Sequence, residues 1–191
     1  TMVLDGQTYH LGHVRRTEMY EARRHTAFVF QNYNLFLNKT ALQNVTEGLI
    51  VARKMPRDEA EARAQKALEK VGLGNRGASY PNQLSGGQQQ RLALARTLAH
   101  PRPLLVLDDP FSALDRKTEE QVFDNLRKMT AGSTVLLISH RLYLFPQMDG
   151  VLWIQDGKAV CAAHKELMAQ NPQYAALVNA QEGGEQDEPE K

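Results

Sequence analysis

The sequence is poor in the features that mark secreted, membrane-spanning and nucleic-acid-binding proteins. It contains one cysteine, Cys161, which excludes an internal disulfide bond and fits a reducing compartment. No apolar run approaches the roughly 18 residues of a membrane-spanning helix, and no segment has the pattern of a signal peptide. The net charge is +1, so no strong overall field attracts nucleic acid or an anionic membrane. We therefore expect a cytosolic globular protein.

The sequence does contain an alternation of strand-like and helix-like segments. Its 191 residues, 42% of them apolar, are sufficient for one sizeable domain or for a core with a smaller lobe. Short apolar runs predict strands around a turn at Asp5-Gly6, at 27–30, 104–109 and 134–140, and in a hairpin at 150–160. Caps and periodicity predict helices at 41–55, 57–71, behind Ser85, and at 117–130, 165–170 and 172–181.

The helical block between Thr40 and Leu98 interrupts the strands, which predicts an α/β core with an inserted α-helical subdomain. We assign residues 1–39 and 100–181 to the core and 40–99 to the helical subdomain. The runs 104–109 and 134–140 are apolar almost throughout, as in parallel strands that are buried on both faces. The last ten residues, 182–191, are acidic and lack periodicity, so we expect a disordered tail.

Three predicted strands end in polar residues suited to phosphate, metal or water. Asp108 and Asp109 follow the run "LLVL", His140 follows "TVLLIS", and Gln31 follows "AFVF". Ligands of α/β sheets bind at the carboxyl ends of the strands, where a carboxylate suits Mg²⁺ or a general base. Each residue alone is also explained as an ordinary surface side chain. We interpret their coincidence as a functional site.

The segment "LSGGQ" places two glycines at the start of a helix, although glycine is a poor helix former. The first backbone N–H groups of a helix have no partner within it and attract anions. Gly86 and Gly87 would let a phosphate approach that backbone, and the Ser85 hydroxyl would add a donor. The alternative is a Gly-rich turn with Ser85 as an ordinary N-cap, which explains the serine but not both glycines.

In this order, "LSGGQQQR", "LLVLDDP", "SALD" and "ISH" resemble the nucleotide-binding domain of an ABC (ATP-binding cassette) ATPase, from about residue 2 to about 180. The resemblance implies a P-loop NTPase-type (RecA-like) core and binding of ATP with Mg²⁺. It also assigns roles to single positions. Gln31 would be the Q-loop glutamine, a nucleotide and metal contact, and Asp108 the Walker B metal ligand. Leu84–Gln88, with Ser85, Gly86, Gly87 and Gln88, would form the nucleotide-binding signature, and Ser112–Asp115 the D-loop, with Asp115 near nucleotide. Asp109 stands at the position of the catalytic glutamate, and His140 would be the catalytic switch histidine.

The resemblance further implies partners. In this family each ATP lies between the P-loop of one domain and the signature of another, so a second nucleotide-binding domain is expected, identical or different. The helical subdomain and the Gln31 region are expected to contact transmembrane transporter subunits, at the cytoplasmic face of the membrane. No nucleic-acid partner is expected, because the net charge is low and neither a long coiled-coil insertion nor a Cys-rich cluster is present.

Two departures from the family pattern qualify this interpretation. No G-x-x-x-x-G-K-[ST] occurs; the one Gly-Lys pair, Gly157-Lys158, is followed by Ala159. We therefore expect an N-terminally incomplete core whose isolated chain is inactive, or else a non-catalytic module that lends its signature to a partner's ATP. Asp109 stands where the family has glutamate, so its carboxylate is one methylene shorter. Segments resembling importers and exporters both occur, and the sequence leaves the direction of transport open.

Overall fold

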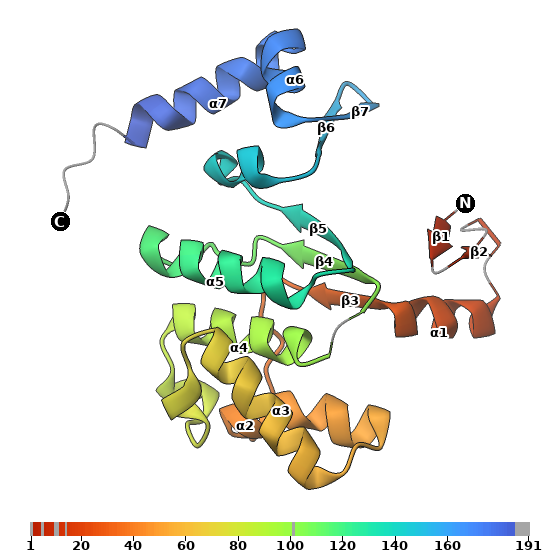
Figure 1. Cartoon of the computed structure of the whole chain (residues 1–191), viewed down its shortest axis with the longest axis vertical. Coiled ribbons are helices and arrows are strands. Elements are labelled where there is room, and N and C mark those ends of the chain that lie inside the picture. The colour runs from red at the N-terminus through yellow and green to blue at the C-terminus, as the bar shows by residue number, and fades with distance from the viewer. Residues whose placement is uncertain (1, 5, 10–11, 14, 101, 186–191) are drawn as a thin grey trace. The chain divides into compact units, whose positions relative to one another are not determined.

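The computed structural model describes residues 2–4, 6–9, 12–13, 15–100 and 102–185, and it falls into two compact units (Figure 1). The first unit covers Thr1–Ile138 and the second Ser139–Lys191. The elements of the first unit are β1 (Met2–Leu4), β2 (Gln7–Tyr9), α1 (Arg16–His25), β3 (Thr26–Val29), α2 (Ala41–Glu47), the π-helical η1 (Gly48–Ala52), α3 (Arg57–Lys70), the 3₁₀ turns η2 (Gly74–Arg76) and η3 (Pro81–Gln83), α4 (Gly86–Leu98), β4 (Leu104–Asp108), α5 (Arg116–Met129) and β5 (Thr134–Ile138).

The central sheet of the first unit is parallel, with strand order β3-β4-β5. Its register places Val29 beside Leu107, and Leu107 beside Leu137. The side chains of Val29, Leu105 and Leu107 lie on the same face of the sheet and are buried, and α4 lies against β3. Parallel strands with helices between them confirm the predicted α/β class.

The opposite face of the sheet differs from the prediction of strands buried on both sides. Phe28 is 44% exposed, Leu136 42% and Ile138 48%, and the ring of Phe28 stacks on Phe30 at a centroid distance of 4.3 Å. β5 also ends at Ile138, two residues earlier than predicted. The prediction that both faces of 134–140 are buried was wrong, because the described residues cover only one face of this sheet. An apolar run indicates that side chains on both faces are hydrophobic, but it does not show that another element packs on each face.

The helical subdomain is built by α2, α3 and α4, which contact one another. Its interior is rich in alanine, which allows close approach of the helices: Ala41, Ala60, Ala64, Ala67, Ala93 and Ala95 are all buried. The predicted helix 41–55 is interrupted, since α2 gives way to the π-helical η1 at Gly48. Glycine is the weakest helix former of this segment, so the change of winding falls there.

Three local differences concern the ends of the first unit and of the chain. Helix α1 was not predicted; half of its ten residues are Arg or Glu, and none of the ten is buried. At the N-terminus β1 and β2 pair antiparallel around Gly6, whose φ is +77°, while Asp5 of the predicted turn lies outside the described residues. At the C-terminus α7 continues to Glu185, so residues 182–185 are helical rather than part of a disordered tail; 186–191 lie outside the described residues.

The second unit comprises η4 (Leu142–Gln147), β6 (Val151–Gln155), β7 (Lys158–Ala162), α6 (His164–Gln170) and α7 (Pro172–Glu185). The predicted hairpin is confirmed, with Asp156 and Gly157 both at positive φ, as a two-residue turn requires. Its core is formed by Leu142, Val151, Leu167, Tyr174 and Val178. In the described part of both units, no helix is long and apolar enough to cross a membrane. The sequence-based division at 40 and 99 stays a prediction.

Candidate functional site

Helix α4 begins with a reciprocal cap. The Ser85 hydroxyl accepts a hydrogen bond from the backbone N–H of Gln88 at 3.3 Å, and the Gln88 side-chain oxygen accepts one from the Ser85 N–H at 3.0 Å. The ordinary N-cap considered for Ser85 is therefore present. Within the described residues, the N–H groups of Gly86 and Gly87 have no acceptor, so two donors remain at the positive end of the helix.

The two glycines have different surroundings. A Cβ atom at Gly86 would meet nothing within 4 Å. At Gly87 it would lie 2.7 Å from the carbonyl oxygen of Ala113 and 3.3 Å from Leu114 Cδ2. Gly87 is thus required by the close approach of α4 to the loop after β4, while Gly86 faces open space that a ligand can enter.

Gln90, one turn further along α4, ties the helix to the loop after β4. Its side-chain amide donates to the carbonyl oxygen of Asp109 at 3.1 Å and to the Ser112 hydroxyl at 3.0 Å, while its side-chain oxygen accepts from the Ala113 N–H at 3.0 Å. Gln90 is 1% exposed. The sequence analysis missed this residue; its spacing of four from Leu94 on the buried face of α4 was the available signal.

Asp108 and Asp109 lie at the carboxyl end of β4 but differ in backbone conformation. Asp108 is the last residue of the strand and is paired in register with Ile138. Asp109 has a φ of +46°, a left-handed conformation that aspartate tolerates better than most residues, and its N–H donates to the carbonyl of Ile138 at 2.8 Å. The turn of the backbone therefore directs two successive carboxylates differently at the same sheet edge. Both side chains are half-buried.

Gln31 lies two residues beyond β3, in an exposed turn at this same edge of the sheet. Tyr33 and Asn34 after it have φ values of +55° and +46°. The Arg96 guanidinium holds their carbonyl oxygens, at 2.9 Å for Tyr33 and 2.6 Å for Asn34. Burial lowers the pKa of Arg96, and the two carbonyl groups provide the acceptors that a desolvated cation needs.

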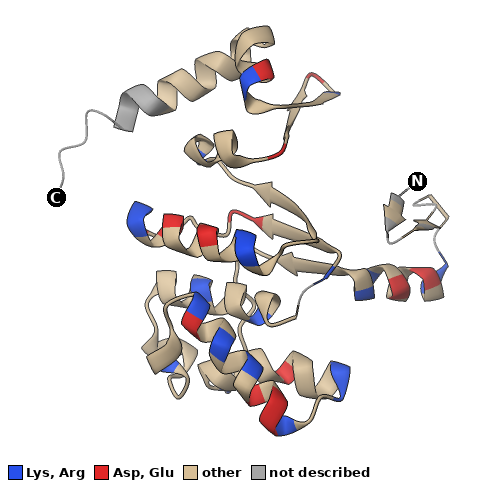
Figure 2. Cartoon of the chain, in the orientation of Figure 1, with Lys and Arg blue, Asp and Glu red and all other residues tan. Residues whose placement is uncertain are grey.

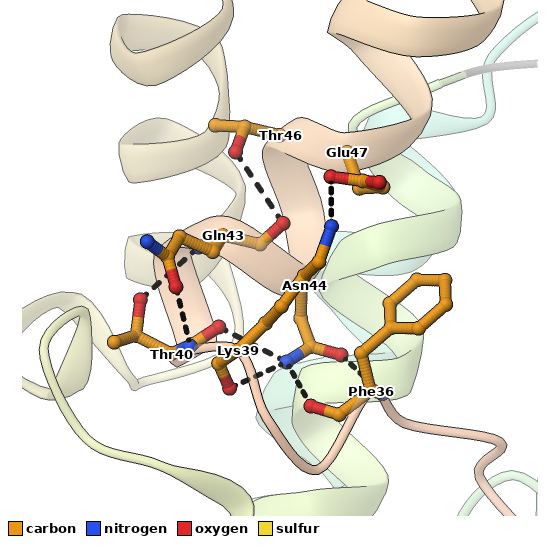
Figure 3. Close-up of polar contacts among 7 residues, drawn as sticks. All are labelled: Phe36, Lys39, Thr40, Gln43, Asn44, Thr46 and Glu47. Carbon is orange, nitrogen blue, oxygen red and sulfur yellow. Dashed lines mark hydrogen bonds and ion pairs between the residues drawn. The ribbon is translucent and has the colours of Figure 1, made fainter.

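Asn44 fixes the segment that leads from this loop into α2 (Figure 3). Its side-chain oxygen accepts from the Phe36 N–H at 2.8 Å, and its amide donates at 3.0 Å to the carbonyl oxygens of Phe36, Lys39 and Thr40. Lys39 forms an ion pair with Glu47 beside it. A fully buried amide with four contacts makes this connection rigid, so the Gln31 loop is held at both ends.

Asp115 caps α5 by accepting a hydrogen bond from the Thr118 N–H at 2.9 Å. This bond is the main reason that the pKa of Asp115 lies below its usual value, with a smaller contribution from Arg91. Arg91 in turn donates to the Val71 carbonyl at 3.0 Å, and its guanidinium lies close to Gly72. The end of the predicted D-loop is therefore held to α5 by its cap, and the charge of Arg91 on α4 acts on it.

His140 belongs to the second unit, so its position is described only within that unit. It is exposed, and its carbonyl oxygen accepts from the side chain of Gln181 at 2.7 Å. Within the first unit, α4 carries Ser85 and Gly86 at its start and is hydrogen-bonded to two other predicted segments, the Asp109 loop through Gln90 and the loop after Gln31 through Arg96. In the described part of the chain, no cluster of three or more His, Cys, Asp or Glu could hold a metal. A cation with several water or phosphate ligands needs fewer protein groups, so the metal role of Asp108 and Gln31 stays a prediction.

The family model described as "ABC transporter" matches residues 1–112. The chain is 41% identical to a probable amino-acid import ATP-binding protein, YxeO of Bacillus subtilis, over 82% of this chain and 64% of that protein. It is 39% identical to the L-cystine transport system ATP-binding protein TcyN of Escherichia coli, over 73% of this chain and 57% of that protein. The chain thus spans less than two thirds of the length of these relatives.

Among solved structures, the chain is similar to a dimeric post-hydrolysis state of the ATP-binding cassette MJ0796 bound to ADP and Pi. The TM-score is 0.73 at 34% identity, and the match covers 82% of this chain and 69% of that one. This likeness confirms the predicted P-loop NTPase fold with its parallel sheet.

Proposed function

Because the chain belongs to the ABC transporter family, we propose that it forms part of the ATP-binding subunit of an amino-acid importer and couples ATP hydrolysis to transport. The names of its relatives support import of amino acids, the direction that the sequence left open. The proposed partners are a second ATP-binding cassette and transmembrane subunits. The proposed location is the cytoplasmic face of the membrane.

At the sheet edge, Asp108 and Gln31 would hold Mg²⁺ through their oxygen atoms. The ion would neutralise charge on the β- and γ-phosphates of ATP. Asp109 would orient the attacking water as its carboxylate accepts a proton, and His140 is proposed as the switch histidine from its place in the family pattern. Asp115, held by its cap to α5, would approach nucleotide at the interface between two cassettes.

The start of α4 would serve the nucleotide bound by the partner cassette. The observation that carries this proposal is the open space at Gly86 beside two N–H donors at the positive end of α4. A γ-phosphate there would accept from backbone N–H groups, as anions do at helix N-termini. A second candidate is a non-catalytic module that only lends this helix start to a competent partner. The sequence feature that favours it is the lack of a G-x-x-x-x-G-K-[ST] match.

The test measures the ATPase rate of a P-loop-containing partner cassette with the chain added. Gly86→Asp should abolish the added activity, because its carboxylate would repel the γ-phosphate at a water-poor interface. The control is Gly48→Asp, another glycine with no atom within 4 Å and no positive φ. An unchanged partner rate with Gly86→Asp would refute the role of α4, while separate assays of Asp109 variants distinguish the enzyme from the non-catalytic module.

A further inference from the structure

Four arginines gather where three helices end in the first unit. Arg53 caps η1 and donates from Nε to Nε2 of His100, at 2.7 Å; His100 lies just beyond the end of α4. Arg102 donates to the carbonyl oxygen of Arg24, in the last turn of α1. Arg63 on α3 is close enough to His100 to lower its pKa. We name Arg24, Arg53, Arg63 and Arg102 around His100 the arginine cluster.

The cluster concentrates positive charge around a neutral histidine. The pKa of His100 falls to about 4, through burial first and then through Arg102, Arg53 and Arg63, so its ring is neutral at pH 7. The pKa of Arg102 is also lowered, by burial and then by Arg53 and Arg24. Within the described residues, none of the four arginines forms an ion pair.

Helix dipoles explain how the fold tolerates this arrangement but not what it is for. Each helix C-terminus carries a partial charge of about −0.5, so three such ends together contribute about −1.5, which is less than the charge of the four arginines. The neutral His100 ring and the Arg24 carbonyl each accept one N–H. A guanidinium has five N–H donors, so most donors of Arg53 and Arg102 have no acceptor among the described protein groups and are open to water or to a ligand. Arg24, Arg53 and Arg63 are exposed.

We propose that the arginine cluster is a docking surface for a carboxylate-rich segment of a protein partner. Arginine binds carboxylates with paired, charge-assisted hydrogen bonds. Nucleic acid fits the surface less well, because the net charge of the chain is only +1. Figure 2 shows the basic residues at the β3 end of α1 and in the segment between α4 and β4. The binding of carboxylates by the arginine cluster does not rest on the proposed function.

The experiment follows binding of a fluorescein-labelled deca-glutamate peptide to the 191-residue chain by anisotropy. The double variant Arg53→Gln/Arg63→Gln should weaken binding about tenfold at moderate salt, as expected for the loss of two exposed charge contacts. The matched control is Lys117→Gln/Lys128→Gln, which removes the same charge from exposed positions of α5 and should change affinity less than about twofold. If Arg53→Gln lowers the melting temperature, Arg24→Gln/Arg63→Gln replaces it, since neither side chain donates a hydrogen bond within the described residues.

Two further probes test whether the arginine cluster binds nucleic acid or lipid instead. They are a ten-nucleotide single strand of DNA and vesicles containing phosphatidylserine. Tighter binding of either one, lost in the cluster variant, would overturn the proposal in favour of nucleic acid or lipid. Absence of peptide binding, or equal weakening by the control variant, would also overturn it. No nucleotide is present in this assay, so its outcome is independent of the proposed function. If the chain binds the peptide but Gly86→Asp leaves the partner's ATPase rate unchanged, the role of the arginine cluster stands and the proposed function is refuted.

Discussion

The side-chain amide of Gln90 donates a hydrogen bond to the backbone carbonyl of Asp109 over 3.1 Å, which connects the signature helix directly to the loop of the second acid. The same side chain also holds Ser112 and Ala113. The helix whose start would touch a partner's ATP is therefore hydrogen-bonded to the loop whose carboxylate would orient water.

The first prediction concerns Gln90. Gln90→Leu should lower the free energy of unfolding by about 2 kcal/mol, because the part-buried carbonyl of Asp109 and N–H of Ala113 lose their partner in the buried side chain of Gln90. Urea unfolding followed by circular dichroism measures the change. Gln121→Leu, at an exposed position of α5, is the control and should change stability by less than about 0.5 kcal/mol. Equal effects would show that the hydrogen bonds of Gln90 carry no stability.

The two glycines of the signature should respond oppositely to alanine. Gly86→Ala should leave stability unchanged or raise it by up to about 1 kcal/mol, because alanine is the better helix former and the site is open. Gly87→Ala should destabilise by about 1–3 kcal/mol, because its Cβ would lie 2.7 Å from the Ala113 carbonyl oxygen. Thermal unfolding of both variants decides this, and a stable Gly87→Ala would contradict the packing explanation.

Asp109 is predicted to be a suboptimal catalytic carboxylate. In an ATPase-competent form of the protein, Asp109→Asn should spare ATP binding and abolish most turnover. Asp109→Glu should leave turnover equal or faster, because a shortfall of about 1 Å in reach can cost about 10²-fold. Single-turnover hydrolysis measures both variants. A strong loss of turnover with Asp109→Glu would contradict this prediction. It would indicate that aspartate is needed here for its left-handed backbone conformation, φ +46°, which glutamate adopts less readily.

His100 should make stability depend on pH. Its pKa is about 4 in the folded chain against an ordinary value of 6.5, mainly through burial and then through Arg102, Arg53 and Arg63. Between these pH values the unfolded state binds more protons, so His100 contributes stability that is complete above pH 6.5 and is lost as the pH falls towards 4. Because the ring is half-exposed, we expect a loss of about 1 kcal/mol.

The control for this titration is His100→Gln, which can still accept from Arg53 but does not titrate. Denaturant unfolding at pH 7 and pH 4.5 should show a smaller loss of stability for the variant than for the natural chain. Identical losses would mean that other groups cause the acid sensitivity.

Short-range patterns were sufficient to predict most elements and the family. The Ser85 cap, the apolar run before Asp108 and the hairpin turn at Asp156-Gly157 each depend on residues a few positions apart, whose conformational preferences act locally. The order of the motifs then placed their strand ends at one edge of a parallel sheet. Helix α1 was not predicted, since half of its ten residues are Arg or Glu and none of them is buried.

The sequence by itself determined the fold class, the family and the candidate residues Gln31, Ser85, Asp108 and Asp109. Only the tertiary structure distinguished Gly87, which packing requires, from Gly86, which is open. It alone also identified Gln90 and Arg96 as the anchors of the two loops, through bonds between residues 19 and 63 positions apart. Contacts over such separations depend on how helices and strands pack, and this packing brings together the arginine cluster although its members are distant along the chain.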